Sequence, residues 1–160
     1  MKQVEVLIVE DNGADRFWLE YALQNLGVNY TLSTVTDGEQ AVDFLLKRGE
    51  YAAAPTPDMI FLDAHLPKAD GIEVLRQVPN AKELAVCVTT NSDGQRQAFR
   101  EEFGIENSNY LLKPVTQESL LSSTCCSILE RRMRRAVAPR TVTPLSVRRE
   151  PLSSVKGRGA

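Results

Sequence analysis

The stretch that decides the fold is Met59 to Pro67, MIFLDAHLP, in which bulky apolar residues run directly into a carboxylate. The apolar run is short and lies between Pro57 and Pro67, a pattern typical of a strand that is buried on both faces. An ionised carboxylate without a partner costs several kcal/mol to bury. We therefore expect Asp63 to lie at the carboxyl end of the strand, at the lip of a crevice and half in water rather than in the core.

Short apolar runs alternate with amphipathic segments along residues 4–130. The pattern predicts strands at 4–9, 30–35, 59–63, 84–89 and 109–112, and helices at 14–26, 37–48, 71–78, 92–104 and from 116 onward. Strands separated by helices form a parallel sheet with right-handed crossovers, and helices must cover both faces because the strands are apolar throughout. The sequence therefore predicts an α/β fold, doubly wound, with five βα units.

Two of the predicted helices are defined by apolar residues at helical spacing. The first is predicted to be amphipathic, with Gly27 as its C-cap and apolar residues at Phe17, Trp18, Tyr21, Ala22 and Leu26. The last is expected to be one helix that begins after Thr116, with an inner face formed by Leu120, Leu121, Thr124, Cys125, Ile128 and Leu129.

Polar side chains follow the predicted strands at their carboxyl ends. Parallel sheets of this kind bind ligands at that edge, at the point where the strand order reverses. The first strand ends in Glu10 and Asp11, the third in Asp63, the fourth in Thr89 and the fifth in Lys113. We expect these side chains to converge on one crevice.

Three carboxylates that lie close together repel one another, and a divalent cation relieves the repulsion. Mg²⁺ prefers oxygen ligands, few of them from protein, with water and phosphate oxygens completing its octahedron. The side chains of Glu10, Asp11 and Asp63 suit this ion, and the backbone carbonyl of His65 is a further candidate ligand.

The remaining strand-end residues predict a place for a phosphoryl group. Lys113 offers a point charge for a phosphoryl oxygen, and the Thr89 hydroxyl offers a hydrogen-bond donor. Carboxylates are known nucleophiles that form aspartyl phosphates, so Asp63 is the candidate nucleophile. Positioning and charge neutralisation would then account for most of the catalysis.

Taken in order, these residues resemble the receiver domain of two-component response regulators over roughly residues 3–130. The matching features are Glu10-Asp11, Asp63 followed by Pro67 and Gly71, Thr89, and Lys113-Pro114. The resemblance implies a flavodoxin-like fold with strand order 2-1-3-4-5. It also implies that Asp63 accepts a phosphoryl group from a sensor histidine kinase with Mg²⁺, in a signalling protein that is not an enzyme acting on other substrates.

The resemblance further implies a pair of coupled switch residues, Thr89 and Tyr110, with Tyr110 three positions before Lys113. The Lys113-Pro114 bond is expected to be cis, an isomer that proline tolerates. Family members often dimerise through the face formed by the fourth helix, fifth strand and fifth helix, so we expect phosphorylation to switch that face and a homodimer to form there.

A narrower resemblance covers FLLKRGEYAAAPTPDMIFLDAHLPKADG, residues 44–71. This segment is similar to the stand-alone response regulators paired with cyanobacterial and bacterial phytochromes, which suggests a phytochrome as the upstream kinase. One departure from the family pattern is the link from Gly71 to Thr89, which is a few residues shorter than usual and predicts a truncated third helix or loop.

Several alternatives compete with this interpretation. Thr90 takes the switch role if the strand register slips by one residue, and Tyr110 can be explained by burial alone. His65, the one histidine, is more simply an exposed loop residue. A phosphatase of the haloacid-dehalogenase type also uses an aspartyl nucleophile, but it carries a second Asp where this chain has His65. A pseudo-receiver that only binds partners is a second rival function, and a protein that binds nucleic acid through its basic tail is the third.

Charge is distributed unevenly along the chain. Residues 1–130 contain 20 Asp and Glu against 10 Lys and Arg, a net charge of −10, whereas residues 131–160 contain 9 Lys and Arg against Glu150, a net charge of +8. The second segment has no aromatic residue, so we expect a receiver domain at 1–130 and a mostly disordered basic tail at 131–160. Without interleaved aromatics the tail is more simply solubilising than a specific nucleic-acid site.

The sequence also predicts a cellular compartment. No apolar run approaches the ~20 residues of a transmembrane helix, and the N-terminus lacks the features of a signal peptide. Three cysteines do not make an even disulfide framework. We therefore expect the reducing cytoplasm and no insertion into a membrane.

Overall fold

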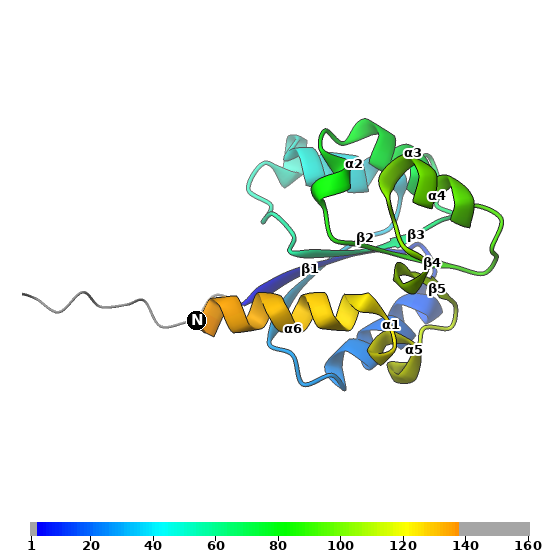
Figure 1. The fold of residues 1–160 in the computed structure, drawn as a ribbon. Helices are drawn as coiled ribbons and strands as arrows, with labels where there is room; N and C mark the ends of the chain where they lie inside the picture. Colours follow the sequence, from blue (N-terminus) through cyan, green and yellow to red (C-terminus); the bar gives the residue numbers. More distant parts are fainter. Residues whose placement is uncertain (1–2, 138–160) are drawn as a thin grey trace, which may run out of the picture.

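A single parallel sheet forms the centre of the computed structural model, which describes residues 3–137 (Figure 1). Its strands are β1 (Val4–Val9), β2 (Tyr30–Val35), β3 (Met59–Asp63), β4 (Val86–Thr90) and β5 (Tyr110–Leu112). The strand order is β2-β1-β3-β4-β5, and all neighbouring strands are parallel. The predicted doubly wound fold and its strand order are confirmed.

Helices cover both faces of this sheet. They are α1 (Gly13–Gln24), α2 (Gly38–Leu46), α3 (Gly71–Gln77), α4 (Arg96–Phe103), α5 (Gln117–Leu121) and α6 (Thr124–Val137), with short 3-10 helices η1 (Gly49–Tyr51), η2 (Ala81–Glu83) and η3 (Asn107–Asn109). Helices α2, α3 and α4 lie on one face, and α1, α5 and α6 lie on the other (Figure 1). Among the helices of residues 3–137, none has the length and apolar character needed to cross a membrane.

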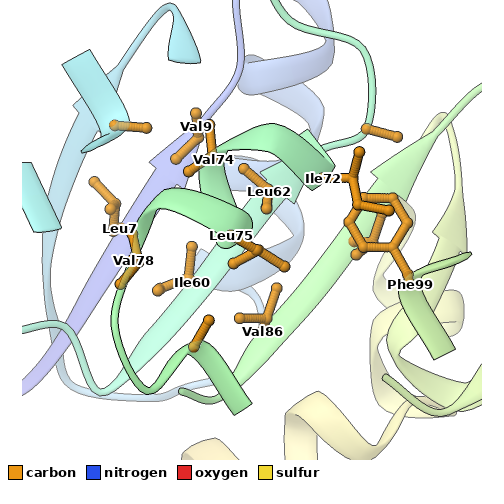
Figure 2. Close-up of a cluster of buried hydrophobic side chains, with 14 of the residues drawn as sticks. Leu7, Val9, Ile60, Leu62, Ile72, Val74, Leu75, Val78, Val86 and Phe99 are labelled. Carbon is orange, nitrogen blue, oxygen red and sulfur yellow. The ribbon is translucent and has the colours of Figure 1, made fainter. Parts of the chain in front are cut away.

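Each face of the sheet has its own hydrophobic core. Figure 2 shows the core under α2, α3 and α4, where Leu75 of α3 lies by Ile60 and Leu62 of β3 and Phe99 of α4 lies beside Ile72. The core on the other face contains Phe61, between these two strand residues in sequence. The four apolar residues of β3 are buried, as predicted, because successive side chains point to opposite faces and both faces are covered, and Asp63 at its end is buried as well.

Strand register brings the functional ends of the strands together. Asp63, the last residue of β3, pairs with Thr89 of β4, and Thr90 pairs with Leu112 of β5. The backbone amide of Lys113 then donates to the carbonyl of Thr90 at 2.8 Å. The carboxyl ends of β1, β3, β4 and β5 therefore lie at one edge of the sheet.

Side-chain caps fix where several helices begin. Asp37 caps α2 by accepting from the Gln40 amide at 2.8 Å, and Thr116 caps α5, as predicted. Helix α3 begins with a capping box in which Asp70 and Glu73 accept reciprocally from each other's backbone amides. Helix α3 has 7 residues, and the expectation that this link is shorter than in the family stays a prediction.

The predicted last helix is wrong in one respect, because it is divided into α5 and α6. The Ser123 hydroxyl donates to the carbonyl of Leu120 at 2.6 Å, so a side chain satisfies a carbonyl at the end of α5. Helix α6 continues to Val137, into the segment predicted as tail. Residues 138–160 lie outside the described residues, so the domain boundary at 130 and the disordered tail stay predictions.

Several element boundaries also differ from the predictions by a few residues. Helix α4 begins at Arg96 because the preceding segment from 92 forms turns stabilised by the Thr90 side chain. Strand β4 is shifted to Val86–Thr90. Asn25, not Gly27, is the C-cap of α1.

The aromatic residues of α1 were expected on the apolar face of an amphipathic helix, but the structure leaves them about half exposed. The buried residues of α1 are Leu19, Ala22 and Leu23, whereas the side chains of Phe17, Trp18 and Tyr21 are 59%, 49% and 53% exposed. The three rings pack on one another, with centroids 5.6 to 6.4 Å apart. We call these three residues the α1 aromatic cluster.

The close approach of α3 to the end of β3 gives a first prediction. A Cβ at Gly71 would lie 2.5 Å from the carbonyl oxygen of Asp63, whereas a Cβ at Gly13, also the first residue of a helix, has Arg16 Nη2 as its nearest atom at 3.8 Å. Alanine stabilises a helix relative to glycine by up to about 1 kcal/mol. We expect Gly71→Ala to lower the free energy of unfolding by about 2 kcal/mol through the clash and Gly13→Ala to leave it unchanged or raise it. Urea unfolding measures both, and equal stabilities of the two variants would contradict this packing.

Candidate functional site

The predicted acidic residues meet at the carboxyl edge of the sheet. Glu10 directly follows β1, Asp63 ends β3, and both are buried, with 2% and 3% of their surface exposed. The expectation that Asp63 lies half in water is therefore wrong, because the Lys113 ammonium provides its counter-charge. Asp11 is exposed beside them. One carboxylate oxygen from each of these three residues lies within 4.8 Å of the others. The structure therefore brings together the three acids that the sequence predicts.

The ammonium group of Lys113 lies among buried carboxylates. Its Nζ is 2.6 Å from Glu10 Oε2, 2.9 Å from Asp63 Oδ2 and 3.2 Å from Asp15 Oδ2, and its side chain is 5% exposed. Three negative groups thus share one positive group, in an environment where water screens charge poorly.

The contact from Asp15 was missed by the sequence reasoning. Asp15 lies in the first turn of α1. Asp11 and the extended N-cap Asn12 precede the helix, so the spacing from Asp11 to Asp15 gave no signal for this contact. Helix α1 therefore contributes directly to the charge balance of the site.

Backbone amides orient the two buried carboxylates. Glu10 Oε1 accepts from the amide of Asn12 at 3.0 Å, and Asp63 Oδ1 accepts from the amide of His65 at 3.0 Å. The His65 side chain itself is exposed, so the main chain of this residue holds Asp63. The predicted use of the His65 carbonyl as a metal ligand stays a prediction.

Burial and hydrogen bonding shift two pKa values in this site. Burial raises the pKa of Glu10 to about 7, although the hydrogen bonds from Lys113 and from the Asn12 amide oppose the shift. Burial acts to lower the pKa of Lys113, but its hydrogen bonds to Glu10 and Asp63 raise it above the ordinary lysine value. Lys113 therefore stays charged around neutral pH, whereas Glu10 titrates there.

The two threonines at the end of β4 have different surroundings. Thr89 pairs with Asp63, and its carbonyl accepts from the Ala64 amide at 2.9 Å. The Thr90 hydroxyl donates to the Ser92 carbonyl at 3.0 Å and accepts from the Ser92 amide at 3.2 Å. The hydroxyl of buried Tyr110 donates to the same Ser92 carbonyl at 3.1 Å.

Strand alternation places the two threonines on opposite faces of the sheet. Val88 and Tyr110 belong to the core under α3 and α4, whereas Cys87 belongs to the core on the other face. Thr90 is two residues after Val88 and shares its face, while Thr89 shares the face of Cys87. The hydroxyl that shares the Ser92 carbonyl with Tyr110 is thus that of Thr90, whereas Thr89 lies on the face of Asp63, and the choice of switch threonine stays a prediction. The Lys113-Pro114 peptide bond is cis, as expected.

Comparison with known proteins adds to this geometry. A family model described as the response regulator receiver domain matches residues 6–124. The chain belongs to the response regulator receiver family. Members of this family are generally signalling proteins, and the order of motifs along the chain had implied the same family.

The relatives include response regulators associated with phytochromes. The response regulator Rcp1 from Synechocystis is 38% identical over 93 residues, which cover 56% of this chain and 63% of Rcp1, so the match spans less than two thirds of that relative. The structure of the bacteriophytochrome response regulator RtBRR has a TM-score of 0.69 at 27% identity and covers 84% of this chain and 91% of RtBRR.

Two further solved structures describe states of such relatives. One is the phosphorylated cyanobacterial phytochrome response regulator RcpA, with a TM-score of 0.58 and 32% identity over 88% of this chain and 98% of RcpA. The other is the Mn²⁺-bound form of Rcp1, with a TM-score of 0.62 and 30% identity over 86% of this chain and 97% of that structure. The similarity to phytochrome-associated response regulators predicted from residues 44–71 is confirmed.

The shared ammonium group gives a second prediction. In Lys113→Met the buried carboxylates of Glu10 and Asp63 lose their counter-charge, and breaking such a pair costs about 3 kcal/mol. The pKa of Glu10 then rises further above its ordinary 4.5. The loss of stability in Lys113→Met is therefore small below pH 4.5, where Glu10 is protonated, and it grows as the pH rises through neutrality.

Urea unfolding at acidic and at mildly alkaline pH measures this dependence. Lys82→Met, which changes an exposed lysine in η2, serves as the control and should change stability little at either pH. A loss in Lys113→Met that is equal at both pH values would contradict the proposed charge balance.

Proposed function

We propose that the chain is a phosphoacceptor switch in which Asp63 accepts a phosphoryl group from a sensor histidine kinase. The observation that carries the proposal is the setting of the Asp63 carboxylate. One oxygen contacts the Lys113 ammonium and the other accepts from the His65 amide, at the edge of the sheet beside Glu10 and Asp11. Membership of the receiver family supports the same role.

The residues that would hold Mg²⁺ are Glu10, Asp11, Asp63 and the carbonyl of His65. The three carboxylates fit this ion, since they are hard oxygen donors from residues that converge within 4.8 Å. The Mn²⁺-bound structure of Rcp1 supports a divalent ion in this family. When bound, the ion supplies positive charge that offsets the charge of the phosphoryl oxygens.

The chain's own residues would then position the reacting groups. A carboxylate oxygen of Asp63 attacks the phosphorus of a phosphohistidine, forming a P–O bond as the P–N bond breaks and the imidazole leaves. Lys113, already 2.9 Å from that carboxylate, offers its ammonium to the transferred oxygens. The hydroxyl of Thr89, which pairs with Asp63 and lies on the same face of the sheet, supplies a further donor.

The new charge on Asp63 would change the arrangement of Tyr110 and of the face formed by α4, β5 and α5. Tyr110 is buried on this face and shares the Ser92 carbonyl with Thr90. Leu112, at the end of β5, is 49% exposed and gives the same region an apolar surface. We propose that this face mediates a homodimer.

A sensor kinase is the proposed phosphoryl donor. The α1 aromatic cluster lies on the helix that also contributes Asp15 to the site, and such an exposed apolar patch is typical of a protein–protein contact. The relatives RtBRR and RcpA suggest that the kinase is a phytochrome. The three cysteines are buried and free, in keeping with the cytoplasm as the proposed compartment.

Phosphorylation of the protein by a small donor gives a third prediction. Incubation with acetyl phosphate and Mg²⁺ should add the mass of one phosphoryl group, since the pocket itself provides the positioning. Asp63→Asn should show no adduct. Asp43→Asn, in α2 and away from the strand ends, should be modified like the native protein. Intact mass spectrometry measures all three.

The same experiment separates the rival functions. If the native protein takes up no phosphoryl group, the favoured function becomes that of a pseudo-receiver that only binds partners. Sustained turnover of p-nitrophenyl phosphate would indicate a phosphatase instead. The chain has the exposed His65 two residues after Asp63, so it lacks the second carboxylate that a phosphatase of the haloacid-dehalogenase type carries there.

The pKa of Glu10 gives a fourth prediction. Since this pKa is about 7, a proton competes with Mg²⁺ for Glu10 below neutrality and is displaced when the ion binds. We expect the affinity for Mg²⁺ to rise by about tenfold between roughly pH 6 and pH 8. Isothermal calorimetry measures the affinity, and Glu10→Gln should remove most of the pH dependence. A flat profile in the native protein would contradict the role of Glu10.

A further inference from the structure

Asp15 contacts the Lys113 ammonium but has no part in the phosphoryl transfer as proposed above. Its Oδ2 lies 3.2 Å from Lys113 Nζ, compared with 2.6 Å for Glu10 Oε2 and 2.9 Å for Asp63 Oδ2. The Asp15 side chain is 24% exposed, whereas those of Glu10 and Asp63 are 3% and 5% exposed. Of these three carboxylates, Asp15 is therefore the most distant from the ammonium and the most accessible to water.

The Lys113 ammonium has no N–H group to spare in this arrangement. A lysine ammonium has three N–H donors and no acceptor, and carboxylate oxygens from Glu10, Asp15 and Asp63 all lie within 3.2 Å of it. Oxygens of a phosphoryl group on Asp63 would be further acceptors for the same three donors. Full contact between Lys113 and a phosphoryl group therefore requires one of the present acceptors to leave.

Asp15 is the carboxylate that leaves the ammonium at the lowest cost. Glu10 and Asp63 are buried, so separating either of them from Lys113 leaves a buried charge without that partner. The Asp15 carboxylate reaches solvent by rotation of its own side chain, and water then takes the place of Lys113. Because Asp15 lies in the first turn of α1, the positive end of the helix dipole stabilises its charge in either position.

The start of α1 fixes the backbone of Asp15 beside the pocket. The side chain of Asn12, the N-cap of α1, accepts from the amides of Ala14 and Asp15 at 2.9 and 3.1 Å. The amide of Asn12 donates to Glu10 Oε1 at 3.0 Å, so the same residue links the helix to the pocket. The Asp15 carboxylate can therefore change its partner while the helix stays in place.

We propose that Asp15 is a positioning residue that holds the Lys113 ammonium in the unphosphorylated protein and competes with the phosphoryl group for it. The inference rests on the proposed phosphoacceptor function and extends it to how tightly the pocket holds the phosphoryl group. Phosphorylation adds negative charge at Asp63. The Asp15 carboxylate repels that charge and occupies an N–H donor that the phosphoryl oxygens need, so it weakens their binding.

The test compares Asp15→Ala with Glu20→Ala in the full-length protein. Glu20 lies on the same helix, its side chain is 32% exposed, and it pairs with Arg16 at 3.9 Å, so its variant removes a similar charge away from Lys113. At saturating Mg²⁺, Asp15→Ala should raise the affinity for beryllofluoride, a phosphoryl mimic, about two- to fivefold, the factor that corresponds to one partly exposed ion pair. Glu20→Ala should leave this affinity, measured by calorimetry, unchanged.

The affinity for Mg²⁺ alone separates competition from a loosening of the fold. Without beryllofluoride, Asp15→Ala should bind Mg²⁺ equally well or more weakly, because a negative charge beside the pocket is gone. The affinities for the mimic and for the ion should thus move differently. A purely structural role of Asp15 would lower both. An affinity for beryllofluoride that is unchanged or lower in Asp15→Ala would overturn the proposal.

The NMR signal of the Lys113 ammonium, assigned through Lys113→Arg, tests the contact in protein without a phosphoryl donor. The signal should shift in Asp15→Ala and stay in place in Glu20→Ala. An unchanged signal in Asp15→Ala would also overturn the proposal. Failure of beryllofluoride to bind the native protein would count against the phosphoacceptor function itself, and the ammonium signal would then decide whether Asp15 holds Lys113.

Discussion

The shared contact of the Lys113 ammonium with Glu10, Asp15 and Asp63 is the interaction on which the site depends. Without it, carboxylates contributed by β1, β3 and α1 would repel one another in a poorly hydrated pocket. The position of the ammonium is set in turn by backbone pairing, because the Lys113 amide donates to Thr90 at the end of β4. The register of the sheet and the charge balance of the site therefore depend on each other. A shift of β5 would move the Lys113 ammonium away from the carboxylates that it stabilises.

Much of this arrangement follows from the sequence because its causes are local and strong. Short apolar runs such as 59–62 can only be buried between layers of helices, and their polar ends must then share one edge of the sheet. That logic placed Glu10, Asp63 and Lys113 together without any knowledge of side-chain conformation. The order of strands came from the family resemblance, since alternating strands and helices alone are compatible with more than one order.

Other features depend on choices that periodicity does not encode. Thr89 and Thr90 are neighbours in the sequence, and neighbouring residues of a strand point to opposite faces of the sheet. Helix α1 has two stripes of apolar residues, and only packing shows that Leu19 and Leu23, not the bulkier rings, enter the core. The end of α5 involves a hydrogen bond from the Ser123 side chain, and the contact of Arg96 with the Tyr110 ring joins the start of a helix to a distant strand.

The exposed rings of α1 have a practical consequence. Trp18 is the single tryptophan of the chain, and it stands three residues from Asp15, a partner of Lys113. Its indole is half exposed and in contact with Phe17 and Tyr21. Fluorescence excited at the red edge of the protein's absorption band therefore comes from Trp18 alone, and this residue lies beside the mouth of the pocket. The molecule carries its own optical reporter for events at that edge of the sheet, with no dye or engineered label required.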